Sequence, residues 1–325
     1  MRRFAFVLPF LLLPAFAQES KDLWIQDFAK AKEQAKAEKK DLLIDFTGSD
    51  WCGWCIKLDK EVFSQSAFTG SAPKDFVLVK LDFPNDESLV TPEIKKQNEQ
   101  LGKQYSIRGY PTILLTDADG LVYGQTGYEA GGPDKYVAML AEMKKKGAAF
   151  QAAMTRATGR QGMERATALD EALSSIDAEV VKNHHLAAME EIVKLDADGK
   201  GKLKEKYEAK VKEIAEEKEL ETEAQALQEM IGPFMQNGEG DKALTELDKV
   251  IAAPKSKIQH QLALFFKGMV TMDVKSDAAA AIKSLEEAKG LVPNSPVAKR
   301  IEQILPELKK QAGNDNGGEK KEEGK

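Results

Sequence analysis

Residues 45–58 read DFTGSDWCGWCIKL and contain both cysteines of the 325-residue chain, Cys52 and Cys55. The apolar run from Asp41 to Phe46 predicts a short buried strand. After Cys55 the apolar residues recur at helical spacing, which predicts a helix. The pair therefore lies where a strand gives way to a helix, and this placement is typical of a disulfide-exchange site.

The two cysteines would have different roles in such a site. Disulfide exchange needs one thiolate that attacks and a second thiol close enough to attack the resulting mixed disulfide. At a helix N-terminus the unpaired N–H groups favour a thiolate, so the pKa of Cys52 would fall below the ~8.5 of a free cysteine. We therefore expect Cys52 to be the nucleophile and Cys55, one turn further on, to be the resolving thiol.

A structural disulfide and a metal site are the alternatives for the pair. A disulfide that closes so short a loop restricts the unfolded chain little and adds little stability. A four-ligand zinc site would need more ligands, but the chain has no further cysteine, and His184, His185 and His260 all lie in its second half. The sequence favours exchange over both alternatives, and we expect neither a metal nor another cofactor.

The first residues have the pattern of a signal peptide. Two arginines precede an apolar run, and residues 15–17 read AFA, an A-x-A cleavage pattern. The run is shorter than the ~20 apolar residues that a transmembrane helix needs, although a retained signal anchor is the alternative. We assign residues 1–17 to a signal peptide and expect an exported, periplasmic protein without a stable membrane span after cleavage.

The charge pattern argues against one class of partner. The formal net charge is −6, and charged residues of both signs make up 31% of the chain. A basic excess, which would attract nucleic acid, is absent from this composition. We therefore expect no nucleic-acid partner.

Residues 18–146 alternate between helical and strand patterns. The expected elements are a helix at 23–35, a strand at 41–46, a helix after Cys55, a strand at 76–82, a helix at 93–105, strands at 112–115 and 121–124, and a helix at 134–144. This order predicts an α/β fold, a mixed sheet with helices on both faces.

These residues resemble the thioredoxin family in three places. A strand at 42–46 leads into WCGWC, RGYPT stands at 108–112, and a closing hairpin and helix with Gly127 complete the pattern. The combination is far more specific than a Cys-x-x-Cys motif alone. The resemblance implies a thioredoxin-like domain over residues 18–146 and protein disulfide oxidoreductase activity.

The resemblance also implies a substrate-binding set around the cysteines. It implies a cis peptide bond between Tyr110 and Pro111, with the backbone of Tyr110 offered to a client chain that docks as an added strand. Trp51 would shield the site, with a core aromatic residue as the alternative. Gly53 and Trp54, between the cysteines, complete the set.

A buried carboxylate completes the implied catalytic group. In the family it relays a proton for the resolving cysteine, and Asp45 is the candidate. Burial would raise its pKa, which suits proton transfer near neutrality. Asp45 stands seven residues before Cys52, whereas six is usual in the family. The role therefore requires the turn at 47–50 to absorb one residue; otherwise Asp45 would point to solvent.

The residues between the cysteines depart from the family patterns. Reductive members usually carry Gly-Pro there, and strongly oxidising members carry Pro-His. This chain carries Gly53 and Trp54. With Asp45 present and no histidine between the cysteines, we expect a reductase or isomerase more than a strong oxidant.

From about residue 147 the strand-like alternation stops. The expected helices are at 162–176, 178–195, 203–231, 239–252, 257–272, 277–291 and 296–310, with a break at Gly232-Pro233. Apolar positions 244, 247 and 250 recur 38 residues later, which is near the ~34 of tetratricopeptide repeats. Residues 147–312 are therefore predicted to be an all-helical domain, solenoid-like or an irregular bundle, followed by a disordered tail at 313–325.

Together these features predict an exported thiol–disulfide oxidoreductase that exchanges disulfides with protein clients. An upstream thiol donor would keep it reduced, and the helical domain would position the client or bind a protein partner. The alternative belongs to another class. It is a partner-binding adaptor or assembly protein whose thioredoxin-like domain acts as a redox sensor.

Overall fold

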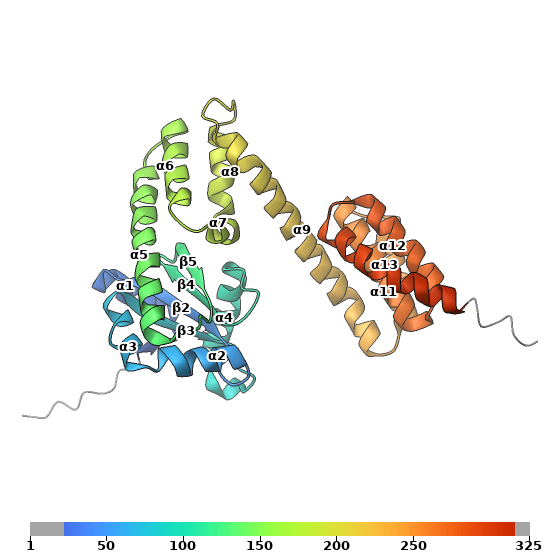
Figure 1. Ribbon diagram of the computed structural model, residues 1–325, viewed down its shortest axis with the longest axis horizontal. Helices are drawn as coiled ribbons and strands as arrows, with labels where there is room; N and C mark the ends of the chain where they lie inside the picture. The colour runs from blue at the N-terminus through green and yellow to red at the C-terminus, as the bar shows by residue number, and fades with distance from the viewer. Residues whose placement is uncertain (1–22, 316–325) are drawn as a thin grey trace, which may run out of the picture. The chain divides into compact units, whose positions relative to one another are not determined.

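The computed structural model describes residues 23–315, so the predicted signal peptide and most of the predicted tail lie outside the described residues. The chain forms two compact units that divide between Glu208 and Ala209. The first contains a mixed sheet with flanking helices, and the second is helical (Figure 1). The predicted fold class is confirmed.

A five-stranded mixed sheet forms the centre of the first unit (Figure 1). Its strands are β1 (Trp24–Ile25), β2 (Asp41–Thr47), β3 (Phe76–Asp82), β4 (Thr112–Thr116) and β5 (Val122–Thr126). They lie in the order β1-β3-β2-β4-β5. β3 is parallel to β1 and β2, whereas β4 is antiparallel to β2 and β5. β2 is thus central, which explains its nearly continuous apolar run.

Helices pack around this sheet. They are α1 (Phe28–Glu38), α2 (Gly53–Leu58), α3 (Ser66–Thr69), α4 (Pro92–Gln104) and α5 (Gly132–Ala157), with the π-helix η1 (Asp59–Phe63) and the 3-10 turns η2 (Ala72–Lys74) and η3 (Glu87–Leu89). α1 and α4 contact β3, and α5 contacts β4 and β5. Large side chains such as Phe46, Phe68 and Tyr136 are fully buried between these layers.

The first helix begins later than predicted, because the first residues of the expected helix form β1. Trp24 and Ile25 pair with the middle of β3. The carboxylate of Asp27 accepts a hydrogen bond of 3.1 Å from the N–H of Lys30 and caps α1. The cap fixes where the helix starts, and pairing with a distant strand takes the residues before it.

The helical region after the sheet starts inside the first unit. α5 runs without interruption through the predicted boundary at 146/147, and α6 (Gly162–Ser174), α7 (Ala178–His184) and α8 (Leu186–Leu195) belong to the same unit. Gly147 allows α5 to pass close to the sheet, because a Cβ there would lie 2.4 Å from the ring of Tyr123. The compact units thus divide later than that boundary, and the predicted limits of the thioredoxin-like domain stay a prediction.

The helix predicted over 178–195 is interrupted at His185. The backbone of His185 leaves the helical region, with φ −123° and ψ 27°. Its buried ring is hydrogen-bonded through Nε2 to the carbonyl of Val122 on β5, at 2.7 Å. His184 is bonded in the same way to the amide oxygen of Gln125, at 2.8 Å. These contacts to β5 fix the bend at His185. The apolar spacing from which the helix was predicted contains no information about them.

The second unit is helical. α9 (Leu203–Gln236) crosses the division between the units, and α10 (Gly240–Ala252), α11 (Lys257–Lys275), α12 (Ala278–Leu291) and α13 (Pro296–Asp315) follow. The helices predicted here are confirmed. The predicted break at Gly232-Pro233 is wrong, since Pro233 lies in the last turn of α9. Phe234 and Met235, which follow this proline, pack against buried apolar residues of the unit, and this packing supports the helix as far as Gln236.

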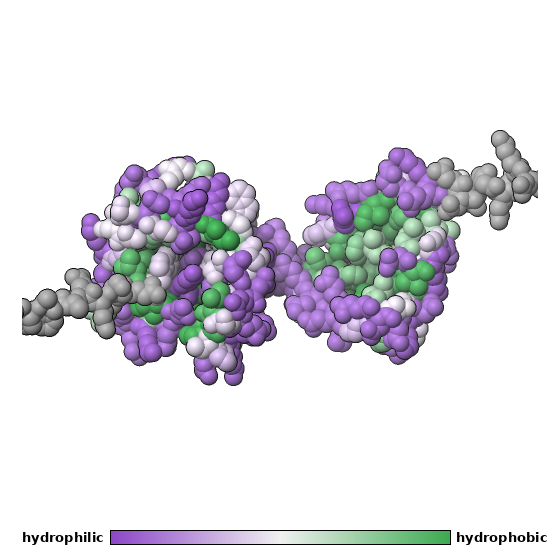
Figure 2. Space-filling view, turned by 90° about the horizontal axis from the view of Figure 1, so that it is seen from below, coloured by the Kyte–Doolittle hydropathy of each residue, from purple (hydrophilic) through white to green (hydrophobic). Residues whose placement is uncertain are grey.

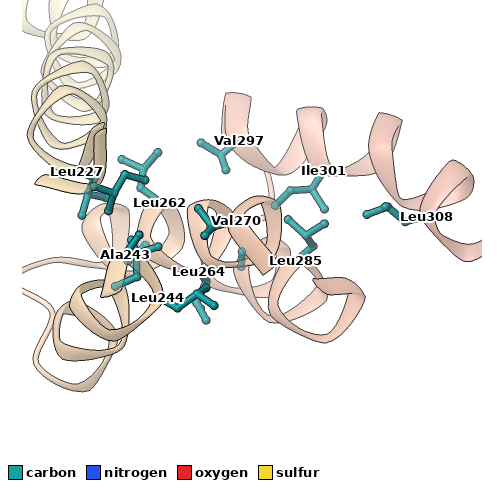
Figure 3. Packing of buried hydrophobic residues seen from close by; sticks show 14 of the residues in the cluster. Leu227, Ala243, Leu244, Leu262, Leu264, Val270, Leu285, Val297, Ile301 and Leu308 are labelled. Carbon is teal, nitrogen blue, oxygen red and sulfur yellow. The ribbon is translucent and has the colours of Figure 1, made fainter. Parts of the chain in front are cut away.

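An apolar core holds the second unit together. Figure 3 shows Leu227, Leu244, Leu262, Leu285 and Ile301 gathered in it, one from each of the five helices. Leu247 and Leu285 are equivalent positions of the predicted repeat, and both are buried in this core. The packing agrees with stacked helical hairpins, while the repeat itself stays a prediction.

Candidate active site

Both cysteines lie at the start of α2, directly after β2 and one turn. Cys52 is the N-cap residue of α2, Cys55 lies in the first turn, and their sulfur atoms form a disulfide bond. The backbone N–H of Cys55 donates a hydrogen bond of 3.2 Å to Sγ of Cys52. The same N–H would stabilise a thiolate on this sulfur after reduction. Cys52 therefore occupies the position that favours a thiolate.

Hydrogen bonds hold the turn before Cys52, the turn that was predicted to absorb one additional residue. The N–H of Cys52 donates to the carbonyl of Gly48 at 2.9 Å, which closes one helical turn. The N–H and the hydroxyl of Ser49 both donate to the carboxylate of Asp82, at 2.9 and 2.5 Å. The carboxylate of Asp50 accepts hydrogen bonds from two backbone N–H groups in the segment after β3. The turn is thereby fixed to that segment, and β2 keeps its register.

Trp51 lies at the surface beside the cysteines. Its side chain is 46% exposed, and its indole N–H donates a hydrogen bond of 2.8 Å to the carbonyl of Phe83. Its ring meets the ring of Tyr110 edge-on, with the centroids 5.7 Å apart. Gly48 leaves room for the indole, because a Cβ at that position would lie 2.5 Å from it. Trp51 is thus not a core residue, and it links the cysteine turn to Tyr110.

Tyr110 and Pro111 are half-buried and joined by a cis peptide bond, as the resemblance implied. Tyr110 also contacts Phe83, with the ring centroids 5.2 Å apart, and burial raises the pKa of its hydroxyl. Pro111 immediately precedes β4 and has no N–H to donate at that end of the strand. Through Trp51, this segment lies next to the residues that carry the sulfur atoms.

Gly53 and Trp54 are exposed between the cysteines. A Cβ added to Gly53 would meet no atom within 4 Å, so the surface is open there. The Trp54 side chain is 58% exposed and contacts the ring of Tyr128, with the centroids 5.2 Å apart. Tyr128 was not predicted as a site residue. The only sequence signal was its place directly after Gly127.

Asp45 is buried on β2 and shares a cavity with Cys55. Both residues line this cavity of about 290 Å³, and only 5% of Asp45 is exposed. Loss of water around the carboxyl group raises the pKa of Asp45 to about 8, although the charge of Lys80 acts in the opposite direction. Its Oδ1 atom has no hydrogen-bond partner among the described residues. Asp45 therefore does not point to solvent, and it can exchange a proton near neutral pH.

Three charged residues around Asp45 were not predicted. Lys80 lies opposite Asp45 in the register of β2 and β3, Asp82 ends β3, and Asp59 begins η1. Lys80 and Asp59 line the same cavity. After burial, Lys80 has the largest influence and lowers the pKa of Asp45, whereas Asp82 and Asp59 raise it. In the sequence, the charged Lys80 stands out within the apolar run of β3, but its pairing with Asp45 depends on the register of the two strands.

The residues that are chemically able to bind a metal ion are scattered. Within residues 23–315, no group of three His, Cys, Asp or Glu side chains could hold one. Burial lowers the pKa of His184 to about 4 and also lowers that of His185. These two rings are therefore neutral near pH 7 and serve the contact with β5.

Comparison with known proteins relates this site to characterised ones. The family model of a thioredoxin-like domain matches residues 28–144. The disulfide bond reductase DsbH of Chlamydia pneumoniae is 35% identical over 116 residues, which are 35% of this chain and 69% of DsbH. The thioredoxin-related protein DsbJ of the same organism is 33% identical over 129 residues, which are 37% of each chain.

A solved structure of a DsbH oxidoreductase is also similar. It is 34% identical, and the match covers 38% of this chain and 83% of that chain, with a TM-score of 0.36. The residues matched by the family model include the cysteine pair, Asp45 and the segment with Tyr110 and Pro111. By this match and the identity to DsbH, the chain belongs to the thioredoxin family.

Proposed function

We propose that this protein is a thiol–disulfide oxidoreductase that exchanges disulfides with protein clients through Cys52 and Cys55. The observation that carries the proposal is the position of Cys52 at the start of α2, where the N–H of Cys55 donates to its sulfur. Its relative DsbH is named a disulfide bond reductase, which supports the same chemistry here.

The dithiol form reduces a client disulfide by two electrons. The Cys52 thiolate attacks one client sulfur, the client S–S bond breaks, one client thiolate leaves, and a mixed disulfide forms. The Cys55 thiolate then attacks Sγ of Cys52, which releases the second client thiolate and forms the Cys52–Cys55 disulfide. The two client thiolates take up the two protons that the cysteines lose. An upstream dithiol protein restores the reduced pair and becomes a disulfide itself.

Asp45 is proposed to take up the proton of Cys55. Cys55 must lose its proton before it can attack the mixed disulfide. Asp45 lines the same cavity as Cys55, and its pKa of about 8 is close to that of a thiol. An ionised Asp45 can therefore accept the proton and return it to solvent through the cavity.

The client chain is proposed to dock along Tyr110 and Pro111. Trp51 contacts Tyr110 and leaves almost half of its own surface exposed, so it would cover one side of the docked chain. Gly53 lies in open surroundings, which leaves room for the client sulfur to approach Cys52. Trp51, Gly53, Tyr110 and Pro111 would thus bind the client and take no part in the bond exchange itself.

The direction of electron flow is proposed to be that of a reductase or an isomerase. No histidine stands between the cysteines, and the relative DsbH is named a reductase. Equilibration with glutathione would measure the reduction potential. We expect a value nearer the ~−270 mV of thioredoxin than the ~−120 mV of a strong oxidant. A value close to the latter would contradict the proposed direction.

The protein is proposed to act after export to the periplasm. Residues 1–17 carry the signal-peptide pattern. Of the helices that the structure describes, none has the length and apolar character needed to cross a membrane. Fractionation of cells, with the mass of the mature chain, tests export; a mature N-terminus near Gln18 is expected, and an uncleaved chain in the cytoplasm would contradict it.

Reduction of insulin by the full chain, with dithiothreitol as donor, tests the exchange activity. We expect Cys52→Ser to abolish turnover, because no thiolate then attacks the client. Cys55→Ala should instead accumulate a mixed disulfide on Cys52, since the second attack is lost. Adducts on Cys55 in a Cys52→Ala variant would reverse the assignment of nucleophile. A wild-type chain that reduces no disulfide would contradict the proposal.

The second unit is proposed to bind a protein partner or to position the client. Figure 2 shows a broad hydrophobic area on one face of this unit, bordered by hydrophilic residues. The partly buried hydrophobic side chains that pack against the core of this unit include Phe265, Phe266 and Met272. Apolar areas of this kind often mark interaction surfaces. An adaptor with a redox-sensing domain is the second candidate function.

One pair of measurements distinguishes the two functions. A stable partner complex that survives Cys52→Ser, in a chain without disulfide turnover, would favour the adaptor. Turnover that depends on Cys52 favours the oxidoreductase. If the second unit positions clients, its binding raises their effective concentration at the cysteines.

A further inference from the structure

Trp54 and Tyr128 form an exposed aromatic pair beside the disulfide. Trp54 lies between the cysteines in α2, whereas Tyr128 follows β5, so the fold brings two distant segments together. Their ring centroids are 5.2 Å apart, with an angle of 38° between the planes. The Trp54 side chain remains 58% exposed. A large apolar ring kept at the surface gains little from burial, so packing stability alone does not account for its position.

Two charged residues hold this pair in place. The ammonium group of Lys57 lies 5.1 Å from the ring centroid of Trp54 and 4.8 Å from that of Tyr128. The hydroxyl of Tyr128 donates a hydrogen bond of 2.6 Å to the carboxylate of Glu61, which lies 4.0 Å from Lys57. The interaction with Tyr128 also raises the pKa of Lys57, so its positive charge is retained. One cation therefore contacts both rings and is itself held by Glu61.

The pair is continuous with the segment proposed to bind the client chain. A Cβ added to Gly127 would lie 3.1 Å from the carbonyl oxygen of Pro111, so these two backbones touch. The hydroxyl of Tyr136 donates to the carbonyl of Gly127 at 3.0 Å and fixes this contact. Tyr128 is the next residue. A client chain that lies along Pro111 would therefore have the Trp54–Tyr128 pair within reach of a side chain near its reactive cysteine.

Trp51 provides an informative contrast with Trp54. The indole N–H of Trp51 is bound by a backbone carbonyl, and its ring edge is packed on Tyr110. Trp51 is thus seated by the protein's own groups. The rings of Trp54 and Tyr128 are instead held by the charged side chains of Lys57 and Glu61 and leave an aromatic surface open. Such a surface suits a flat or bulky apolar side chain, which would stack on it.

We propose that Trp54 and Tyr128 form a specificity subsite for an aromatic or large aliphatic side chain next to the reactive cysteine of the client. Lys57 and Glu61 act as positioning residues that hold the two rings. This inference rests on the proposed exchange function and adds a preference among its clients. The reaction steps are unchanged, since the subsite contributes only to binding of the client before and during attack by Cys52.

A matched pair of peptides tests the subsite. Both carry the same disulfide and differ only in the residue next to one cysteine, Phe in one and Ser in the other. We expect the full-length wild type to reduce the Phe peptide with a kcat/KM roughly five- to tenfold higher. Tyr128→Ala and Trp54→Ala should each bring this ratio below about twofold. Tyr128→Phe, which retains the ring, should keep most of the preference.

The ratio separates the subsite from effects on the chemistry. A variant that alters folding or the reactivity of Cys52 changes the rates of both peptides alike, so the ratio stays constant. Met163→Ala removes another exposed apolar side chain, from α6 in the same unit, and should keep the wild-type ratio.

Four outcomes would overturn the subsite. A wild-type ratio near one, or the same ratio in the alanine variants, contradicts it while the exchange function stands. A ratio that falls equally in Met163→Ala also contradicts it, because the effect is then not local. Failure of the wild type to reduce either peptide contradicts the proposed function itself, and the subsite with it.

Discussion

Each unit buries several polar side chains, and Gln261 and Asp45, one from each unit, differ in how their polar atoms are used. Gln261, in the second unit, is fully buried, and its amide N–H groups donate to the carbonyls of Ala288 and Val292 at 2.9 and 3.1 Å. Its amide oxygen accepts from the hydroxyl of Ser295 at 2.7 Å. Asp45, in the first unit, is 5% exposed, and its Oδ1 atom has no such partner among the described residues.

The difference separates a structural role from a chemical one. A buried polar group with all its hydrogen bonds made stabilises one arrangement of the chain. A buried carboxyl group without them costs stability when it ionises, so its pKa rises towards the range in which it exchanges protons. Gln261 joins α11 to α12 and to the start of α13, whereas Asp45 shares a cavity with Cys55.

Asp45→Asn should stabilise the first unit at high pH, and this is the largest effect we expect. The pKa of Asp45 is about 8 when folded and ~3.9 when unfolded, so the native state binds the proton more tightly. Its contribution is fully present below pH ~4 and is lost as the pH rises towards 8. At pH 8 the variant should therefore exceed the wild type in free energy of unfolding by on the order of 3–5 kcal/mol.

Urea unfolding between pH 4 and 8, followed by tryptophan fluorescence, measures this difference. Trp24, Trp51 and Trp54 all lie in the first unit, so the signal reports on that unit. The same variant should lose insulin reductase activity, because the proton acceptor for Cys55 is gone. Identical pH profiles for the two proteins would show that Asp45 ionises freely, which contradicts the contrast with Gln261.

Gln261→Leu should destabilise the second unit by about 2–4 kcal/mol. The change removes three hydrogen bonds and leaves the buried carbonyl of Ala288 and the partly buried carbonyl of Val292 without this donor, at roughly 1–3 kcal/mol for a buried unsatisfied group. Faster amide hydrogen exchange over residues 257–291 measures the effect. Insulin reduction should be unaffected, since Gln261 lies far along the chain from the cysteines and serves only α11–α13.

An exposed glutamine provides the matched control. Gln225 on α9 donates to Glu229 at 2.7 Å in full contact with solvent. Gln225→Leu should change the free energy of unfolding by less than about 0.5 kcal/mol, because water replaces the lost partner. Equal effects of the two substitutions would mean that the buried hydrogen bonds of Gln261 do not stabilise the second unit.

Local patterns predicted most elements of both units. The strand at 76–82 has the predicted limits, and the cysteine pair lies between strand and helix as expected. What they missed depends on contacts between distant residues. The two residues of β1 form a strand only because β3 offers an edge, and the bend at His185 depends on a carbonyl of β5. Both partners are set by the tertiary fold rather than by neighbouring residues.

The site shows the same limit. Asp45, the acid proposed to exchange a proton with Cys55, could be named from the family resemblance, because it stands on the strand directly before the cysteine motif. Its electrostatic partners could not, since Lys80 meets Asp45 through strand register and Asp59 through the π-helix after α2. The helix break predicted at Pro233 was wrong for a related reason. The local rule for proline does not include the packing of Phe234 and Met235, which follow Pro233 on α9, against the apolar core of the second unit.

Lys80→Met should shift the protonation of Asp45, with a smaller effect than either substitution above. Lys80 faces Asp45 across β2 and β3, and its charge favours the ionised carboxylate. Without it, the pKa of Asp45 rises further above its unfolded value, by roughly one pH unit or less. The free energy of unfolding of the first unit, which falls between pH 4 and 8 in the wild type, should then keep falling to higher pH. Urea unfolding at pH values from 4 to 10 measures the pH at which this fall ends.

A second background separates this coupling from other effects of Lys80, which also lies 4.0 Å from Asp82. In Asp45→Asn the carboxyl group is gone, so Lys80→Met should leave the pH dependence unchanged. The difference between the two backgrounds is the energy of the pair alone. If the shift persists in Asp45→Asn, it comes from Asp82, and Asp45 is then not the group that gives the first unit its dependence on pH. If Lys80→Met shifts the pH dependence of the wild type but not that of Asp45→Asn, the titrating group is Asp45, which lines the same cavity as Cys55.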